Sequence, residues 1–203
     1  MKIPNPIKNT RVTLKHLALA AVLSASFLTG TAQAGIPITW NVAVDGAWDT
    51  TTANWTLDGS TLTTFASDGS EDAIFAAGTT GHTITIPSAM SPASTTVSGG
   101  SYTFSGGPLA GSGSLTKSGS GTLNIDDLVS GSGTVVQNTY SGGTIMNGGT
   151  LHLGGMFAGI SPDCRGALGT GPVTLNAGTI EFDRYTETNA LLVYGGTLYS
   201  QNG

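Results

Sequence analysis

Aliphatic and polar residues alternate in short runs along much of the chain. The clearest runs are 123–125 (Leu-Asn-Ile), 151–153 (Leu-His-Leu) and 180–182 (Ile-Glu-Phe). Successive side chains of a β-strand point to opposite faces, so these runs predict strands with one aliphatic and one polar face. Shorter runs separated by Asp-Gly turn signals predict further strands at 39–44, 61–65, 73–75 and 83–86.

A Gly-Thr-aliphatic triplet precedes or opens the later strands. It begins at Gly121, Gly149, Gly178 and Gly196, with spacings of 28, 29 and 18 residues. One coil of about 20 residues cannot bury its aliphatic face alone, whereas stacked coils bury a continuous column. We therefore predict an all-β protein built as a right-handed parallel β-helix. The unequal spacings leave an antiparallel meander or sandwich as an alternative; in the β-helix, 155–167 would be a projecting loop.

The tryptophans and the glycines occupy different parts of the chain. Trp40, Trp48 and Trp55 lie within 16 residues, whereas 24 of the 30 glycines after residue 34 lie between Gly99 and Gly203. We place a boundary near residue 97, with a leading β segment at 35–96 and the repeats at 97–203. The tryptophans are expected to form the core of a cap on the repeats, because aromatic rings dominate small cores.

Residues 1–34 have the three parts of a secretory signal peptide. A basic segment precedes the 12 apolar residues 17–28, and the small residues Ala32 and Ala34 predict cleavage after Ala34. The apolar stretch is too short to span a hydrocarbon core of about 30 Å. The sequence thus predicts a secreted or cell-surface protein, with no membrane insertion of 35–203.

Charge is scarce and negative after residue 34. Residues 35–203 contain three bases and twelve acids, which gives a net charge of −9. Nucleic-acid binding is therefore not expected, because neutralising phosphates needs a basic face. The single cysteine, Cys164, excludes an intrachain disulfide, so packing and backbone hydrogen bonds must stabilise the fold.

Four segments of the repeat region follow one another in a fixed order. They read G-x-L-T-K-x-G-x-G-T-L, then N-T-Y-x-G-G-T, then N-G-G-T-L, and then L-G-x-G-x-V-T-L-N-x-G-T-I. In this order they resemble the passenger-associated β-strand repeats of bacterial autotransporters. The matching segments are 113–125 (GSLTKSGSGTLNI), 138–145 (NTYSGGTI), 147–154 (NGGTLHLG) and 167–180 (ALGTGPVTLNAGTI).

The resemblance implies a parallel β-helix passenger segment that is displayed at the cell surface or released from it. Autotransporters also carry a C-terminal β-barrel, which needs many strands of about ten residues. No such region follows the last repeat here, and the chain stops at Gly203, soon after the triplet at Gly196. We therefore expect 97–203 to be a truncated repeat region.

Two groups of acidic residues are candidates for chemistry. Asp126 and Asp127 are adjacent. A glycosidase needs two carboxyl groups that face one cleft, whereas neighbours on a strand point to opposite faces, so we expect this pair to lie in a turn after Ile125. Glu181 and Asp183 would share one face of a strand.

Together with Glu187 and Arg184, Glu181 and Asp183 resemble the carboxylates that bind Ca²⁺ and the base in a polysaccharide lyase. Solvated charge on an outer face is the simpler interpretation of these residues.

The histidines and the cysteine do not form a recognisable site. His82 and His152 lack a second ligand at metal-binding spacing, so no zinc site is expected. His152 alternates with two leucines and should face solvent. Cys164 lies beside Arg165, which would favour a thiolate, but the sequence places no general base next to it. We assign no catalytic, cofactor-binding or metal-ligating residue.

The sequence thus favours a non-enzymatic exported scaffold that acts by contact, in adhesion or as part of a surface structure. Its expected partners are polysaccharide, another cell-surface protein, or further copies of itself at an open strand edge. A carbohydrate-binding module that uses the tryptophans as a stacking platform is the alternative, and the polysaccharide lyase is a third hypothesis.

Overall fold

The computed structural model describes residues 34–41, 45–76, 81–126, 137–154, 166–182 and 188–200. Residues 33–203 belong to one compact unit, to which the description below is confined. The regular structure of the described residues consists of β-strands. This confirms the prediction of an all-β protein. The predicted signal peptide, apart from Ala34, lies outside the described residues.

The described strands form two sheets. In spatial order, the nine-stranded sheet contains β15 (Leu191–Val193), β13 (Val173–Leu175), β11 (Thr144–Met146), β9 (Ser114–Lys117), β7 (Ser94–Val97), β5 (Glu71–Phe75), β1 (Ile36–Trp40), β3 (Trp55–Thr56) and β4 (Leu62–Thr63). The seven-stranded sheet contains β16 (Thr197–Ser200), β14 (Thr179–Phe182), β12 (Thr150–Leu153), β10 (Thr122–Asp126), β8 (Tyr102–Gly106), β6 (His82–Ile86) and β2 (Gly46–Ala47).

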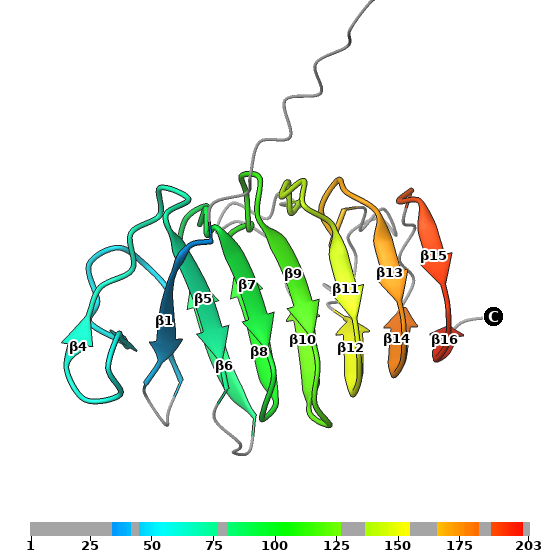
Figure 1. Cartoon of the computed structure of the whole chain (residues 1–203), viewed down its shortest axis with the longest axis horizontal. Coiled ribbons are helices and arrows are strands. Elements are labelled where there is room, and N and C mark those ends of the chain that lie inside the picture. The colour runs from blue at the N-terminus through cyan, green and yellow to red at the C-terminus, as the bar shows by residue number, and fades with distance from the viewer. Residues whose placement is uncertain are drawn as a thin grey trace, which may run out of the picture. The chain divides into compact units, whose positions relative to one another are not determined.

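From β5 onward, consecutive strands alternate between the two sheets. β5 pairs in parallel with β1, and β6 with β2. From β7 onward each strand pairs in parallel with the strand two places before it, so that the strands of one sheet follow one another in sequence order (Figure 1). Antiparallel pairing among the described strands is confined to β3, which lies between β1 and β4. The parallel sheets therefore exclude the antiparallel alternative for the repeat strands.

The register aligns the repeated triplets. Thr122 lies opposite Thr150, Thr150 opposite Thr179, and Thr179 opposite Thr197. The four triplets thus form one column across neighbouring strands, as expected for stacked repeats.

The same ladder continues toward the N-terminus. Leu123 lies opposite Tyr102, and Tyr102 lies opposite His82. In the other sheet, β7 pairs with both β5 and β9, so the ladder crosses residue 97 without a break.

Inward-facing side chains stack in columns that follow the register. One column of the seven-stranded sheet contains Leu123, Leu151 and Ile180, each fully buried. Because the aliphatic groups of successive strands lie about 4.8 Å apart, each one removes its neighbours from water. The alternation seen in the sequence is therefore the pattern of the core.

The three tryptophans pack into this core. Their rings are at most 2% exposed. Trp48 lies 5.3 Å from Trp55 and 5.4 Å from Phe75 between ring centroids, and Phe75 lies 5.0 Å from Phe104. Phe75 and Phe104 belong to strands of the two parallel sheets, so the cluster joins the leading segment to the ladder. The prediction that the tryptophans form a core is confirmed.

Several predicted boundaries differ from the structure. The strand expected at 39–44 is β1, which begins at Ile36 and ends at Trp40, and 42–44 lie outside the described residues. The strand expected at 61–65 is shorter, because Phe65 turns into the aromatic cluster. Of the predicted loop 155–167, residues 155–165 lie outside the described residues, while Ala167 is fully buried and belongs to the core.

Corner glycines lie against the backbone of the neighbouring strand connection. A Cβ atom at Gly121 would overlap the carbonyl oxygen of Gly100. By contrast, a Cβ atom at Gly81 would meet nothing closer than 3.9 Å. The close approach of neighbouring strand connections thus requires glycine at position 121 but not at position 81.

We predict that Gly121→Ala lowers the free energy of unfolding by about 3 kcal/mol, because backbone must move to admit the methyl group. Gly81→Ala is the matched control and should change it by less than about 1 kcal/mol. Urea denaturation followed by tryptophan fluorescence measures both variants. Equal losses in the two would contradict the close approach of the corners.

Candidate interaction surface

The last described coil presents an open edge. We define the terminal rung as residues 188–200, which include β15 and β16. Among the described strands, each of these pairs on one side only. The rung is held to the preceding coil by backbone hydrogen bonds, including one from Thr197 N to Gly178 O of 2.8 Å. Within the described residues, no strand pairs with the backbone donors and acceptors of its outer edge.

The inward positions of the terminal rung are exposed. Val193 continues the column of Leu175, and Leu198 continues the column of Ile180. Leu175 and Ile180 are fully buried, whereas Val193 and Leu198 are 53% and 45% exposed. The end of the hydrophobic core therefore reaches the surface here.

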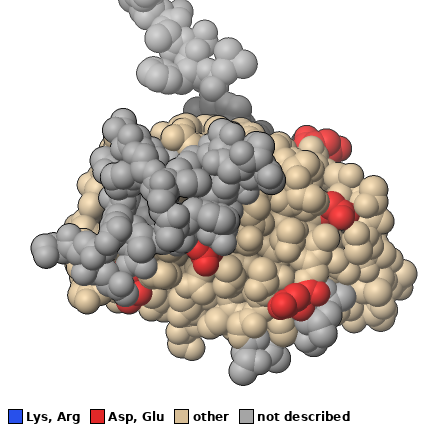
Figure 2. All heavy atoms as spheres, turned by 180° about the vertical axis from the view of Figure 1, so that it is seen from behind, with Lys and Arg blue, Asp and Glu red and all other residues tan. Residues whose placement is uncertain are grey.

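The terminal rung contains no charged side chain. Its sequence is TNALLVYGGTLYS, and Leu192, Tyr194 and Tyr199 add exposed apolar area beside the inward positions. Elsewhere acidic side chains are scattered over the surface, as on the face seen in Figure 2. If two terminal rungs came into contact, no charged side chains of these residues would repel one another.

The opposite edges of both sheets are shorter. They are formed by β4 and β2, of two residues each. Short edge strands offer few backbone groups for pairing. The two ends of the ladder are therefore unequal as interaction sites.

One cation lies inside the stack. Lys117 faces inward from β9, between Val97 and Met146 in the same column, and is fully buried. Its Nζ atom donates to the carbonyl oxygens of Ser118 at 2.6 Å and of Gly119 and Gly148 at 3.4 Å. The ammonium group thus joins the corners of two neighbouring coils.

Burial has a direct effect on this ammonium group. Removal from water lowers the pKa of Lys117 below its ordinary value. A Cβ atom at Gly149 would lie 2.7 Å from Nζ, so this glycine leaves the space that the ammonium group occupies. The alternation of 115–117 could have indicated an inward lysine, but its charge suggested a solvated position.

The candidate catalytic acids are not assembled by the described residues. Asp126 is the last residue of β10, opposite Ser105, so the strand extends one residue beyond the turn expected after Ile125. Glu181 lies on β14, opposite His152 and Tyr199. Their proposed neighbours lie outside the described residues: Asp127, Asp183, Arg184 and Glu187.

The histidines lie on different strands. His152 points away from the core, as expected, and its Nδ1 atom lies 3.2 Å from Asn124 Oδ1 on the neighbouring strand. His82 Nδ1 lies 3.9 Å from Asp45 Oδ1. Within the described ranges, no group of three or more acidic, histidine or cysteine residues could hold a metal ion. Cys164 lies outside those ranges.

The buried tryptophans offer no ring for stacking on a sugar. Their exposure of at most 2% leaves no ring face in contact with solvent. The carbohydrate-binding hypothesis required such a platform, so these three residues do not support it.

Aspartates hold two turns of the leading segment, of which the Asp-Gly signal at Asp58 predicted one. Asp49 accepts hydrogen bonds from the backbone and hydroxyl groups of Thr51 and Thr52. Asp58 does the same for the residues after it, and the backbone N–H groups of Thr61 and Ser60 hold its pKa well below the usual range. Both aspartates stabilise exposed turns.

Comparison with known proteins found no relative of this chain. No family model, curated protein or solved structure matches the chain. The autotransporter resemblance therefore rests on the four repeat segments alone. In the part of the chain that the structure describes, no helix is long and apolar enough to cross a membrane.

We predict that the stability contributed by Lys117 rises with pH. Its pKa is lower in the folded chain than in the unfolded chain, so the unfolded chain binds more protons as the pH approaches 10.5, the ordinary value. The free energy of unfolding of the native chain, relative to Lys117→Met, should increase between pH 8 and pH 10.5. Urea denaturation at several pH values measures this difference, and a constant difference would contradict it.

Proposed function

We propose that the chain is an exported, right-handed parallel β-helix that serves as a scaffold and acts by contact at or beyond the bacterial cell surface. The observation that supports this most is the column formed by Thr122, Thr150, Thr179 and Thr197. Repeats that resemble those of a surface-protein family also stack in register, so the resemblance and the geometry favour the same architecture.

The polar faces of the stack support a scaffold role. Asn176 Nδ2 donates to Asn147 Oδ1 at 2.8 Å, and Asn124 Nδ2 donates to Thr103 Oγ1 at 3.1 Å. These contacts join neighbouring strands on the outside, while the aliphatic columns join them inside. Such a stack holds its terminal coil at a fixed distance from the leading segment, which suits display of a contact surface.

The partner that best fits the terminal rung is a second copy of the chain. An identical rung supplies strands of the same length and apolar character, and neither rung carries charge. Because the opposite edges have only two-residue strands, the two copies would meet through the same surface. Such a contact is isologous and closes at a dimer.

We predict that the exported chain is a monomer at low concentration and a dimer at high concentration. Leu192→Lys should abolish the dimer, because it places charge on an outward position of β15 that is 46% exposed. Leu62→Lys on β4, at a side chain that is 49% exposed, is the matched control and should leave the dimer intact. Sedimentation equilibrium measures the mass; a persistent monomer or an open-ended polymer would contradict the proposal.

Export is tested on the full chain in a bacterial host with a general secretion system. The native chain should leave the cytoplasm and lose residues 1–34. Leu23→Arg should be retained at full length, because it places a charge in the apolar segment. Asn9→Arg adds the same charge to the basic segment and should be exported. Cell fractionation and intact mass measure the outcome, and export of Leu23→Arg at the native level would overturn this part of the proposal.

A further inference from the structure

Gly35 lies against the carboxylate of Asp72. A Cβ atom at Gly35 would lie 2.8 Å from Asp72 Oδ1 and 2.7 Å from Ala93 Cβ. Backbone nitrogen and Cβ of one residue are about 2.5 Å apart, so the Gly35 nitrogen lies at most about 5.3 Å from this oxygen. Opposite charges interact appreciably at such a distance.

The Asp72 carboxylate is held in place. Ser94 Oγ donates to Asp72 Oδ1 at 2.7 Å, and β5 positions Asp72 between Pro37 of β1 and Ser94 of β7. The carboxylate that faces Gly35 is thus fixed by strands on both sides.

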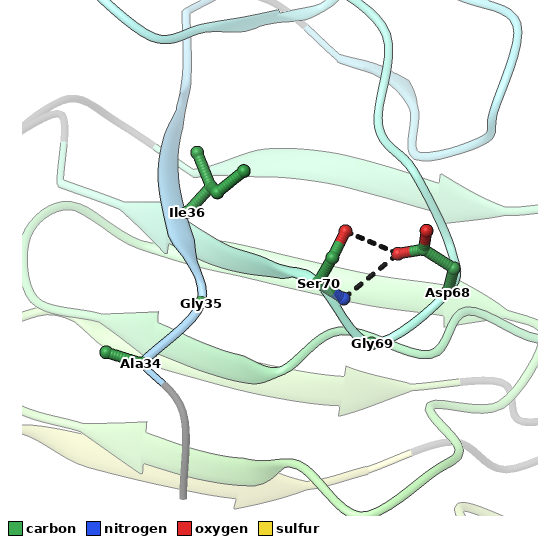
Figure 3. Close-up of a pocket in the computed structure, with 6 residues that line it drawn as sticks. All are labelled: Ala34, Gly35, Ile36, Asp68, Gly69 and Ser70. Carbon is green, nitrogen blue, oxygen red and sulfur yellow. Dashed lines mark hydrogen bonds between the residues drawn. The ribbon is translucent and has the colours of Figure 1, made fainter.

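The start of β1 is also fixed. Ile36 N donates to Ser70 O at 2.8 Å, which ties the strand to the residue before β5. Figure 3 shows Ala34, Gly35 and Ile36 along one side of a pocket whose other side is formed by Asp68, Gly69 and Ser70. The peptide bond between Ala34 and Gly35 therefore lies at the rim of this pocket, whose lining includes one carboxylate, that of Asp68.

Cations that could pair with the Asp72 carboxylate are rare in this chain. Residues 35–203 contain one lysine and two arginines. The lysine is Lys117, which is buried in the stack. An α-ammonium group at Gly35 would add a fourth cation to the one lysine and two arginines, and it would lie beside the Asp72 carboxylate.

We propose that cleavage after Ala34 creates an ion pair between the new α-ammonium group of Gly35 and the Asp72 carboxylate, which fastens the processed end to the first parallel strands. Hydrolysis consumes one water molecule: Ala34 leaves with the carboxylate, and Gly35 keeps the nitrogen, which takes up a proton. The inference rests on the cleavage site in the proposed function. Processing thus converts an uncharged peptide bond into a structural contact.

The test uses the processed chain, purified after export. Its one lysine is buried, so a water-soluble acetylating reagent near neutral pH modifies the α-amine. We expect acetylation to lower the midpoint of thermal unfolding by roughly 2–4 °C in the native chain. The same acetylation should leave the midpoint of Asp72→Asn unchanged, because that variant has no carboxylate to lose.

The control is Glu181→Gln on β14, which removes one negative charge elsewhere and should keep the native sensitivity to acetylation. Equal shifts in the native chain and Asp72→Asn would overturn the ion pair. Intact mass separates the two proposals: a processed chain that begins at a residue other than Gly35 would refute the cleavage site. A chain that begins at Gly35 but shows no difference between native and Asp72→Asn would refute the ion pair alone.

Discussion

The structure depends on how closely the connections between neighbouring parallel strands approach each other. Parallel strands pair at about 4.8 Å, and the connections between them must approach equally closely. At Gly121 and Gly171 a side chain would collide with the backbone of an earlier strand connection, the nearest atoms belonging to Gly100 and Ser141. The high glycine content is therefore a condition for the stacking that buries the aliphatic columns.

Polar residues inside the stack help to fix its register. Asn138 Oδ1 accepts from Leu109 N at 2.7 Å, and its Nδ2 donates to Ala167 O at 2.6 Å. Thr144 Oγ1 donates to Leu168 O at 3.2 Å and lies 2.7 Å from the hydroxyl of Tyr140.

These contacts explain why the N-T-Y-x-G-G-T segment has polar residues at buried positions. Its asparagine joins the coil before it to the coil after it, and its tyrosine and threonine complete the hydrogen bonds of the same corner. A shift of register would leave these buried groups without partners, at a cost of about 1–3 kcal/mol each. Aliphatic columns tolerate such a shift more easily, so the polar groups supply specificity that the columns lack.

The sequence predicted the repeat strands well, because alternation and the Gly-Thr triplets both reflect the geometry of a pleated ladder. It did not show that β6 belongs to that ladder, since His82 stands in the column where later strands have leucine or isoleucine. The inward position of Lys117 was also missed. Its charge suggested exposure, whereas the corner carbonyl oxygens that receive it become neighbours only after the coils stack.

The two ends of the ladder differ in the side chains that they carry and in how far those side chains are buried. At the leading end, buried rings such as Trp48 and Phe75 fill the space beside the first coils, so the core ends in a dense aromatic cluster. At the other end, Leu198 occupies the position that Ile180 fills one coil earlier, yet nothing in the described chain covers it. An aliphatic column gains most of its stability from having a neighbour on both sides. Among the described residues, the columns of the terminal rung therefore lack one of the two neighbours that the columns of the inner strands have.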